Sequence, residues 1–223
     1  DFAEGVYDEG FGTRKSRLAV HTRRLLFVKS NPESPARTGY WVIHDRLIPK
    51  DDKPHTYETL FHLSAEMEDI TASPSTSTVF TSSPEANIRI QSAQSDDVGV
   101  LAGQKDPMRG WQRARSAAAP LPVASFTSSG VGRHDRVYLL MPIPPGTESP
   151  APTLTVTESD GNLSAEIAFD DGEVHRVGFA DQVSASTGRF GTMFSDGRAF
   201  WIAVRDNNLL GSFVVDGSVI REE

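Results

Sequence analysis

The sequence predicts an all-β protein, a large antiparallel β-sandwich of about fourteen strands with little helix. Stretches in which apolar and polar residues alternate recur along the chain, as in residues 17–29 and 55–65. Asp-Gly, Asn-rich and Pro-rich connections separate these stretches at the spacing typical of hairpins. In the last third of the chain, no helical periodicity competes with this pattern.

Composition excludes several classes of partner and site. The 22 Lys and Arg against 30 Asp and Glu give a formal charge of −8, which argues against nucleic acid or an anionic membrane as the partner. No apolar run approaches the length of a membrane span. The absence of cysteine excludes disulfides, thiolate metal sites and a cysteine nucleophile. Because the chain starts at Asp1 without a leader-like stretch, we expect a processed or truncated start.

The first half of the chain is organised around residues 17–65. A short extended piece at Val6 and Tyr7 precedes three extended segments, residues 17–29, 40–48 and 55–65, which we expect to pair in one sheet. NPESPARTG and KDDKP break the pattern between them with proline and glycine.

The middle of the chain is rich in serine, threonine and proline. Short strands are expected at 78–81 and 86–91, on a surface edge, and at 98–101. A long loop follows, with one helical turn near 112–118. Two further strands, 121–129 and 133–143, are joined at SSGVG.

A proline-rich segment, residues 146–152, is the clearest internal hinge and divides the chain into residues 1–145 and 153–223. The second part reads as an antiparallel meander that completes the same sandwich or an adjoining one. Its expected strands are LTVTE, SAEIAF, EVHRVGF, GRFGTMF, RAFWIAV and LLGSFVV.

Four of the six histidines lie in residues 17–65, at positions 21, 44, 55 and 62. Strand alternation places His55 and His62 on opposite faces, with His55 beside Tyr57. A cross-strand metal cluster of His21, His44 and His62 is one alternative. The favoured interpretation is that these histidines are hydrogen-bonded framework residues, so no metal ligand and no catalytic residue is assigned.

Two hydrolase chemistries find little support. The sequence lacks the Gly-x-Ser-x-Gly elbow that presents a serine nucleophile. Paired carboxylates could indicate a glycoside hydrolase, but the three acidic doublets lie in predicted turns, where turn chemistry explains them better. These doublets are Asp51-Asp52, Asp96-Asp97 and Asp170-Asp171.

The most suggestive binding pattern is Arg109, Trp111, Arg113 and Arg115. An indole face can stack on a sugar ring, while guanidinium groups hold carboxylates or sulfates. The favoured alternative is a loop fixed by a buried Trp111 with solvated arginines around it.

Several motifs in residues 1–145 resemble the C-terminal β-sheet region of the heparinase II/III-like family of bacterial polysaccharide lyases. They are HTRR followed by LLFVK, then YWVI with DRL, and then HTYETLFHL. Gly110-Trp111 and the Leu121-Pro122 strand are similar to later parts of the same region. Their order and spacing carry the resemblance, whereas residues 153–223 match in architecture only.

The resemblance implies a role for the chain within a larger enzyme. Family members join an N-terminal α/α toroid to antiparallel sheets and cleave uronic-acid polysaccharides by β-elimination, with Tyr and His as acid and base. Their Asn-His, His-x-His and His-Asn-Thr motifs are absent here, so neither catalytic residues nor the structural zinc can be assigned to this chain. The implied partners are the toroid of the same lyase and an acidic polysaccharide, in the periplasm or outside the cell. The expected substrate-binding residues are His21, Arg23, Arg109, Trp111 and Arg113.

Two other functions stay open at the level of sequence. One is a stand-alone carbohydrate-binding or cell-surface β-sandwich that uses Trp111 and its arginines. The other is an enzyme whose site is built on the histidine-bearing strands.

Overall fold

The computed structural model describes residues 1–9, 11, 17–30, 38–65, 67, 69–113, 118–147, 149–182 and 186–222, with the side chain of Arg113 excepted. Within these ranges the protein is all-β, as predicted: strands pair antiparallel throughout, and a single 3-10 turn, η1 (Pro74–Thr76), is the only helical element. None of the described residues form a helix that could cross a membrane.

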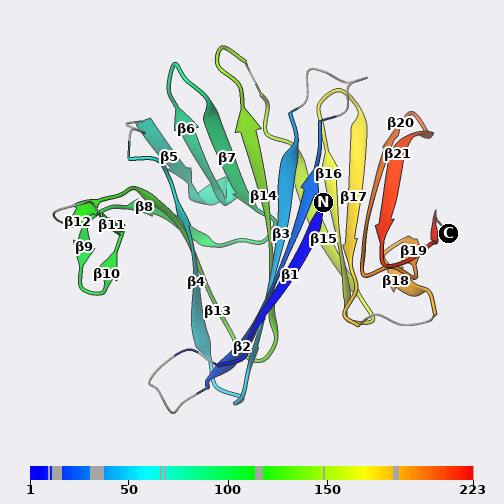
Figure 1. The fold of residues 1–223 in the computed structure, drawn as a ribbon, viewed down its shortest axis with the longest axis horizontal. Coiled ribbons are helices and arrows are strands. Elements are labelled where there is room, and N and C mark those ends of the chain that lie inside the picture. Colours follow the sequence, from blue (N-terminus) through cyan, green and yellow to red (C-terminus); the bar gives the residue numbers. More distant parts are fainter. Residues whose placement is uncertain are drawn as a thin grey trace.

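A seven-stranded antiparallel sheet forms the middle layer of the molecule (Figure 1). Its strands, in spatial order, are β1 (Phe2–Tyr7), β2 (Ala19–Val28), β3 (Tyr40–Pro49), β14 (His134–Ile143), β7 (Asn87–Ser92), β6 (Thr78–Ser82) and β5 (Asp69–Ser73). Residues on both faces of β3 are buried, for example Val42 on one face and Ile43 on the other. Each face of this sheet is therefore covered by another layer.

A three-stranded sheet of β4 (His55–His62), β13 (Val123–Gly130) and β8 (Asp97–Leu101) covers one face. The core between the two sheets includes Ile43, Ile90, Phe126 and Tyr138. The expectation that residues 55–65 pair with 17–29 and 40–48 is wrong, because the turn after β3 carries the chain across to this facing sheet.

A five-stranded sheet covers the opposite face, and apolar residues from both sides of segment 146–152, such as Leu139 and Leu154, share its core. Whether that segment acts as a hinge stays a prediction. The strands are β15 (Thr153–Ser159), β16 (Asn162–Ala168), β17 (Glu173–Phe179), β20 (Ala199–Arg205) and β21 (Asn208–Val215).

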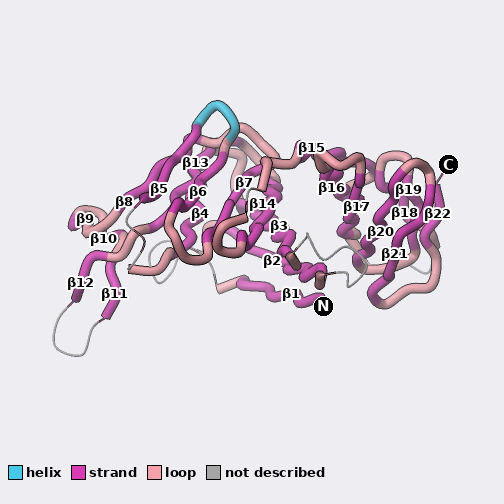
Figure 2. Tube along the Cα trace, turned by 90° about the horizontal axis from the view of Figure 1, so that it is seen from above, coloured by secondary structure: helices cyan, strands magenta, loops and turns pink. Residues whose placement is uncertain are grey.

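A small sheet of β18 (Gly188–Phe190), β19 (Met193–Ser195) and β22 (Ile220–Glu222) lies on the outer face of the five-stranded sheet. Phe190, Met193 and Phe200 are buried between them. The chain thus forms four layers, and Figure 2 shows β15–β17 on the side of β3 and β14 that lies away from β4 and β13.

Several local expectations need correction. The helical turn near 112–118 is wrong, because β11 (Trp111–Arg113) and β12 (Ala118–Pro120) pair as a hairpin on either side of residues outside the described set. Strands β6 and β7 are internal, with Val79 and Ile90 buried, and β5 takes the edge. GRFGTMF folds as the β18–β19 hairpin rather than one strand.

Twenty-two strands appear in the described residues, more than the predicted fourteen, because several have only two or three residues. They include the β9 (Gln104–Lys105) and β10 (Met108–Arg109) pair beside β8 (Figure 1).

A buried ionic cluster ties the seven-stranded sheet to the five-stranded one. Asp135 on β14 accepts hydrogen bonds from Nε2 of His44 at 2.6 Å and Nε of Arg46 at 2.7 Å, both on β3. Arg46 also bonds Asp181, which follows β17, and Arg133 bonds Asp135 at 2.6 Å. Each carboxylate and guanidinium therefore has an opposite charge beside it, which a buried ion requires.

Candidate functional site

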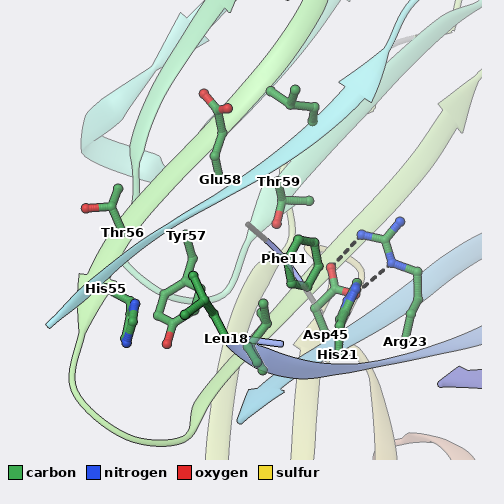
Figure 3. A pocket seen from close by; sticks show the side chains of 13 residues that line it. Phe11, Leu18, His21, Arg23, Asp45, His55, Thr56, Tyr57, Glu58 and Thr59 are labelled. Atoms are coloured by element: carbon green, nitrogen blue, oxygen red, sulfur yellow. Dashed lines mark hydrogen bonds and ion pairs between the residues drawn. The ribbon is translucent and has the colours of Figure 1, made fainter. Parts of the chain in front are cut away.

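A pocket of about 320 Å³ opens between β2 and β3 on one side and β4 on the other (Figure 3). Its size lies at the lower end of the range for ligand pockets. All but one of its lining residues come from the three extended segments of residues 17–65, the exception being Phe11. The others are Leu18, Ala19, His21, Arg23, Asp45, Leu47, His55, Thr56, Tyr57, Glu58, Thr59 and Leu60.

Asp45 organises the β2–β3 side of the pocket. Its side chain is 1% exposed and accepts Nε and Nη2 of Arg23, each at 2.6 Å, while Nε2 of His21 lies 2.8 Å away. Burial alone would raise the pKa of Asp45, but the hydrogen bonds from Arg23 and His21 hold it below its ordinary value. An ionised carboxylate can only accept hydrogen bonds, so the neutral ring of His21 that bonds Asp45 carries its proton on Nε2. Its Nδ1 is then the acceptor nitrogen of the ring.

Cross-strand register explains this arrangement. Arg23 pairs with Asp45, and His21 pairs with Leu47, so these side chains share the face of the sheet that looks toward β4. Since the bidentate fork of Arg23 is already engaged by Asp45, it is not available as a two-point clamp for a ligand carboxylate. This wall of the pocket is closer to neutral than cationic.

The β4 side of the pocket is aromatic and hydroxylic. Tyr57 stacks on His134 with ring centroids 4.3 Å apart, and burial, followed by the charge of Asp51, raises the pKa of Tyr57. Nε2 of His55 lies 2.6 Å from Asp51. Glu58 projects to the opposite face of β4 (Figure 3).

His134 is buried behind Tyr57, where its Nε2 lies 2.8 Å from the hydroxyl of Ser128. Burial, followed by the charge of Arg136, lowers the pKa of His134 to about 4. The unfolded chain therefore binds this proton at a higher pH than the folded one.

The stability that His134 contributes is expected to be present above about pH 6.5 and to be lost as the pH falls toward 4. His134→Gln, which keeps a hydrogen-bonding group, should flatten this part of the curve of unfolding free energy against pH. Urea unfolding between pH 7 and pH 4 measures the difference. Parallel curves for wild type and variant would contradict it.

The predicted binding residues do not form one site. Arg109 bonds Glu58 at 2.8 Å on the outer face of β4, whereas His21 and Arg23 face the pocket. Nε1 of Trp111 donates to the carbonyl of Gln104 at 2.6 Å, and the ring is partly buried. This bond ties Trp111 to the β9–β10 pair, and whether the residue binds a sugar stays a prediction; the side chain of Arg113 and all of Arg115 lie outside the described residues.

The metal cluster of His21, His44 and His62 is wrong. His44 lies on the face of β3 that packs against Phe179, His21 projects from the other face of the sheet, and His62 is exposed at the end of β4. Among the described residues, no three His, Cys, Asp or Glu side chains are grouped as metal ligands. The prediction that alternation separates His55 from His62 is consistent with the burial of β4, since His62 is exposed and His55 lines the pocket.

The acidic doublets have structural partners. Asp51 bonds His55, Asp96 bonds Ser92 at 2.5 Å and Arg136 at 3.0 Å, and Asp171 accepts the backbone N–H of Glu173 at 3.1 Å. Asp45 and Tyr57, by contrast, were missing from the expected binding set. Both stand within the motifs, but only the strand register shows that they line one pocket.

Comparisons with known proteins give a match in structure only. No family model matches the sequence, and no curated protein matches it. The structure is similar to part of the heparan sulfate lyase HepC from Pedobacter heparinus, with 18% identity and a TM-score of 0.48 over 68% of this chain. A mutant of the same lyase gives 18% identity and a TM-score of 0.49 over 74% of this chain. The chain spans about a quarter of those solved chains, 23% in each case.

Proposed function

We propose that this chain is the β-sheet portion of a polysaccharide lyase that cleaves uronic-acid polysaccharides by β-elimination, and that its β2–β4 pocket forms one wall of the substrate cleft. The catalytic groups and the α/α toroid belong, in this proposal, to other parts of the enzyme. The enzyme would act in the periplasm or outside the cell.

The observation that carries the proposal is the convergence of the three motif segments. The motifs HTRR-LLFVK, YWVI with DRL, and HTYETLFHL, which carry the resemblance to lyase sheet domains, supply all of the residues that line a single pocket except Phe11, Leu18 and Ala19. The pocket combines apolar side chains, such as Leu18 and Leu47, with the hydroxyls of Tyr57 and Thr59. A sugar ring presents the same combination of apolar faces and hydroxyl edges.

The near-neutral charge of the pocket defines its role. β-Elimination requires neutralisation of the substrate carboxylate, removal of the adjacent proton and protonation of the leaving oxygen. Arg23 is already bound to Asp45, so this wall is suited to hold the sugar rings rather than to neutralise their charge. Asp45 in turn fixes the orientation of His21 at the rim.

Adjacent residues on β3 provide a matched test of binding. Leu47 lines the pocket, whereas Ile48 is 46% exposed and projects from the opposite face. We expect Leu47→Glu to weaken the binding of uronate hexasaccharides by about tenfold or more, since it places a carboxylate against the ligand. Ile48→Glu should bind like wild type. Isothermal titration with hexasaccharides of hyaluronan and alginate measures both, and equal affinities for the two variants would contradict this placement of the ligand.

A further inference from the structure

A second groove, of about 420 Å³, lies on the outer face of the five-stranded sheet. The small sheet buries Phe200 and Ile202 of β20 but leaves the outer faces of β15 and β16 open. The β18–β19 hairpin stands beside this open face and forms the wall of the groove. The core of the five-stranded sheet separates this groove from the β2–β4 pocket.

The floor of the groove is hydroxylic. Thr155, Thr157 and Ser159 project from alternate positions of β15, and Ser164 lies next to them on β16. Beside these hydroxyls, Glu166 on β16 pairs with Arg176 on β17. The floor therefore offers hydrogen-bonding groups throughout.

The charged groups of the groove are paired. Nε of Arg176 lies 2.9 Å from Glu166, and its Nη1 lies 3.2 Å from Glu222. Arg189 contributes a further positive charge on the wall, so the lining holds two arginines and one glutamate, and Glu222 outside the lining offsets part of the charge of Arg176. The groove is close to neutral, which disfavours a densely sulfated ligand.

Hydrogen bonds join the β18–β19 hairpin, which forms the wall, to the floor of the groove. The backbone N–H of Gly191 donates to the hydroxyl of Ser159 at 3.2 Å, and Nδ2 of Asn162 donates to the carbonyl of Arg189 at 3.1 Å. Gly191 has a φ of +67°, which a residue with a side chain rarely adopts. Nε of Arg189 donates to the carbonyl of the same glycine at 3.0 Å. These bonds hold the groove open in one shape, and such preorganisation lowers the entropic cost of binding.

We propose that this groove is an accessory binding site for a hydroxyl-rich saccharide chain of low charge density. The Arg176 and Glu166 pair presents donors and acceptors side by side, which matches adjacent sugar hydroxyls, and the hydroxyls of Thr155, Thr157 and Ser159 form a row along β15. The site is independent of the β2–β4 pocket and would anchor the protein to polysaccharide whether or not the chain belongs to a lyase.

Nuclear magnetic resonance of the chain tests this proposal, with a hyaluronan hexasaccharide as the weakly charged probe and a heparin hexasaccharide as the densely sulfated one. Hyaluronan should shift the amide signals of β15–β17 and the β18–β19 hairpin in a saturable manner, and heparin should bind the groove more weakly. Thr157→Arg, which fills the groove, should weaken hyaluronan binding there by about tenfold or more.

Thr153→Arg is the matched control, because Thr153 lies on the same exposed face of β15 but outside the groove. It should bind hyaluronan at the groove like wild type. The proposal is overturned if hyaluronan gives no saturable shifts at the groove, if the shifts persist unchanged in Thr157→Arg, or if heparin binds the groove more tightly. Signals of His21 and Tyr57 report on the other pocket separately, so failure here leaves the lyase proposal standing.

Discussion

Asp135→Ala is expected to lower the free energy of unfolding by about 3–5 kcal/mol, because it removes a carboxylate that the buried His44 and Arg46 both bond. Asp135 holds His44, Arg46 and Arg133 at the junction of the two large sheets. Loss of the carboxylate leaves Arg46, whose side chain is 5% exposed, with Asp181 as its remaining carboxylate, and it leaves Nε2 of the buried His44 without its partner. Urea unfolding at pH 7 measures the change, and Asp52→Ala, at an exposed turn position, serves as the control.

The pH dependence of this variant gives a second readout. Burial alone would raise the pKa of Asp135, but hydrogen bonds from His44 and Arg46 hold it well below its ordinary range. Its contribution is therefore present above about pH 4 and lost as the pH falls toward the folded-state pKa. Asp135→Ala should be less sensitive to acid than wild type over this range. An unfolding free energy within about 0.5 kcal/mol of wild type at pH 7 would show that the cluster is not stabilising.

Phe126→Ala is expected to cost about 3–5 kcal/mol of unfolding free energy, the usual range when a buried phenylalanine is removed. Phe126 is 1% exposed and packs edge-on against Phe61 and Tyr138, at ring distances of 5.8 and 5.3 Å. These rings hold β4 and β13 against the seven-stranded sheet. The variant should therefore also weaken oligosaccharide binding at the β2–β4 pocket.

Val131→Ala provides the control for Phe126→Ala, because Val131 is 58% exposed in the turn after β13. Its unfolding free energy should stay within about 0.5 kcal/mol of wild type. Equal thermal unfolding midpoints for the two variants would argue against the packing described for the three-stranded sheet.

Local periodicity was sufficient to predict the fold class and most strands. A period of two depends only on neighbouring residues, and it correctly placed β2, β3 and β14 and the opposite faces of β4. The partition into sheets could not be predicted, because β14 enters between β3 and β7 through contacts between distant parts of the chain. The sheet to which β4 belongs could not be predicted for the same reason. Its apolar and polar residues would alternate in the same way in the seven-stranded sheet as in the three-stranded one.

The candidate site was predicted in part. His21 and Arg23 do line the pocket, but their bonds to Asp45 follow from register across β2 and β3, which the sequence does not specify. The bond from the indole N–H of Trp111 to the backbone of Gln104 could not be predicted either, because it depends on how the β9–β10 pair folds back toward β11. Whether Trp111 stacks on a sugar stays a prediction.

Formation of an unsaturated uronate tests the central claim most directly. The protein expressed from its complete coding sequence would be incubated with heparan sulfate, chondroitin, hyaluronan and alginate, and the ultraviolet absorbance of the new double bond recorded. We expect product from at least one of these polysaccharides, with a raised KM and little change in kcat for Leu47→Glu, because that pocket holds the sugar without taking part in the chemical step. If no unsaturated product forms from any uronic-acid polysaccharide, the proposed function is wrong.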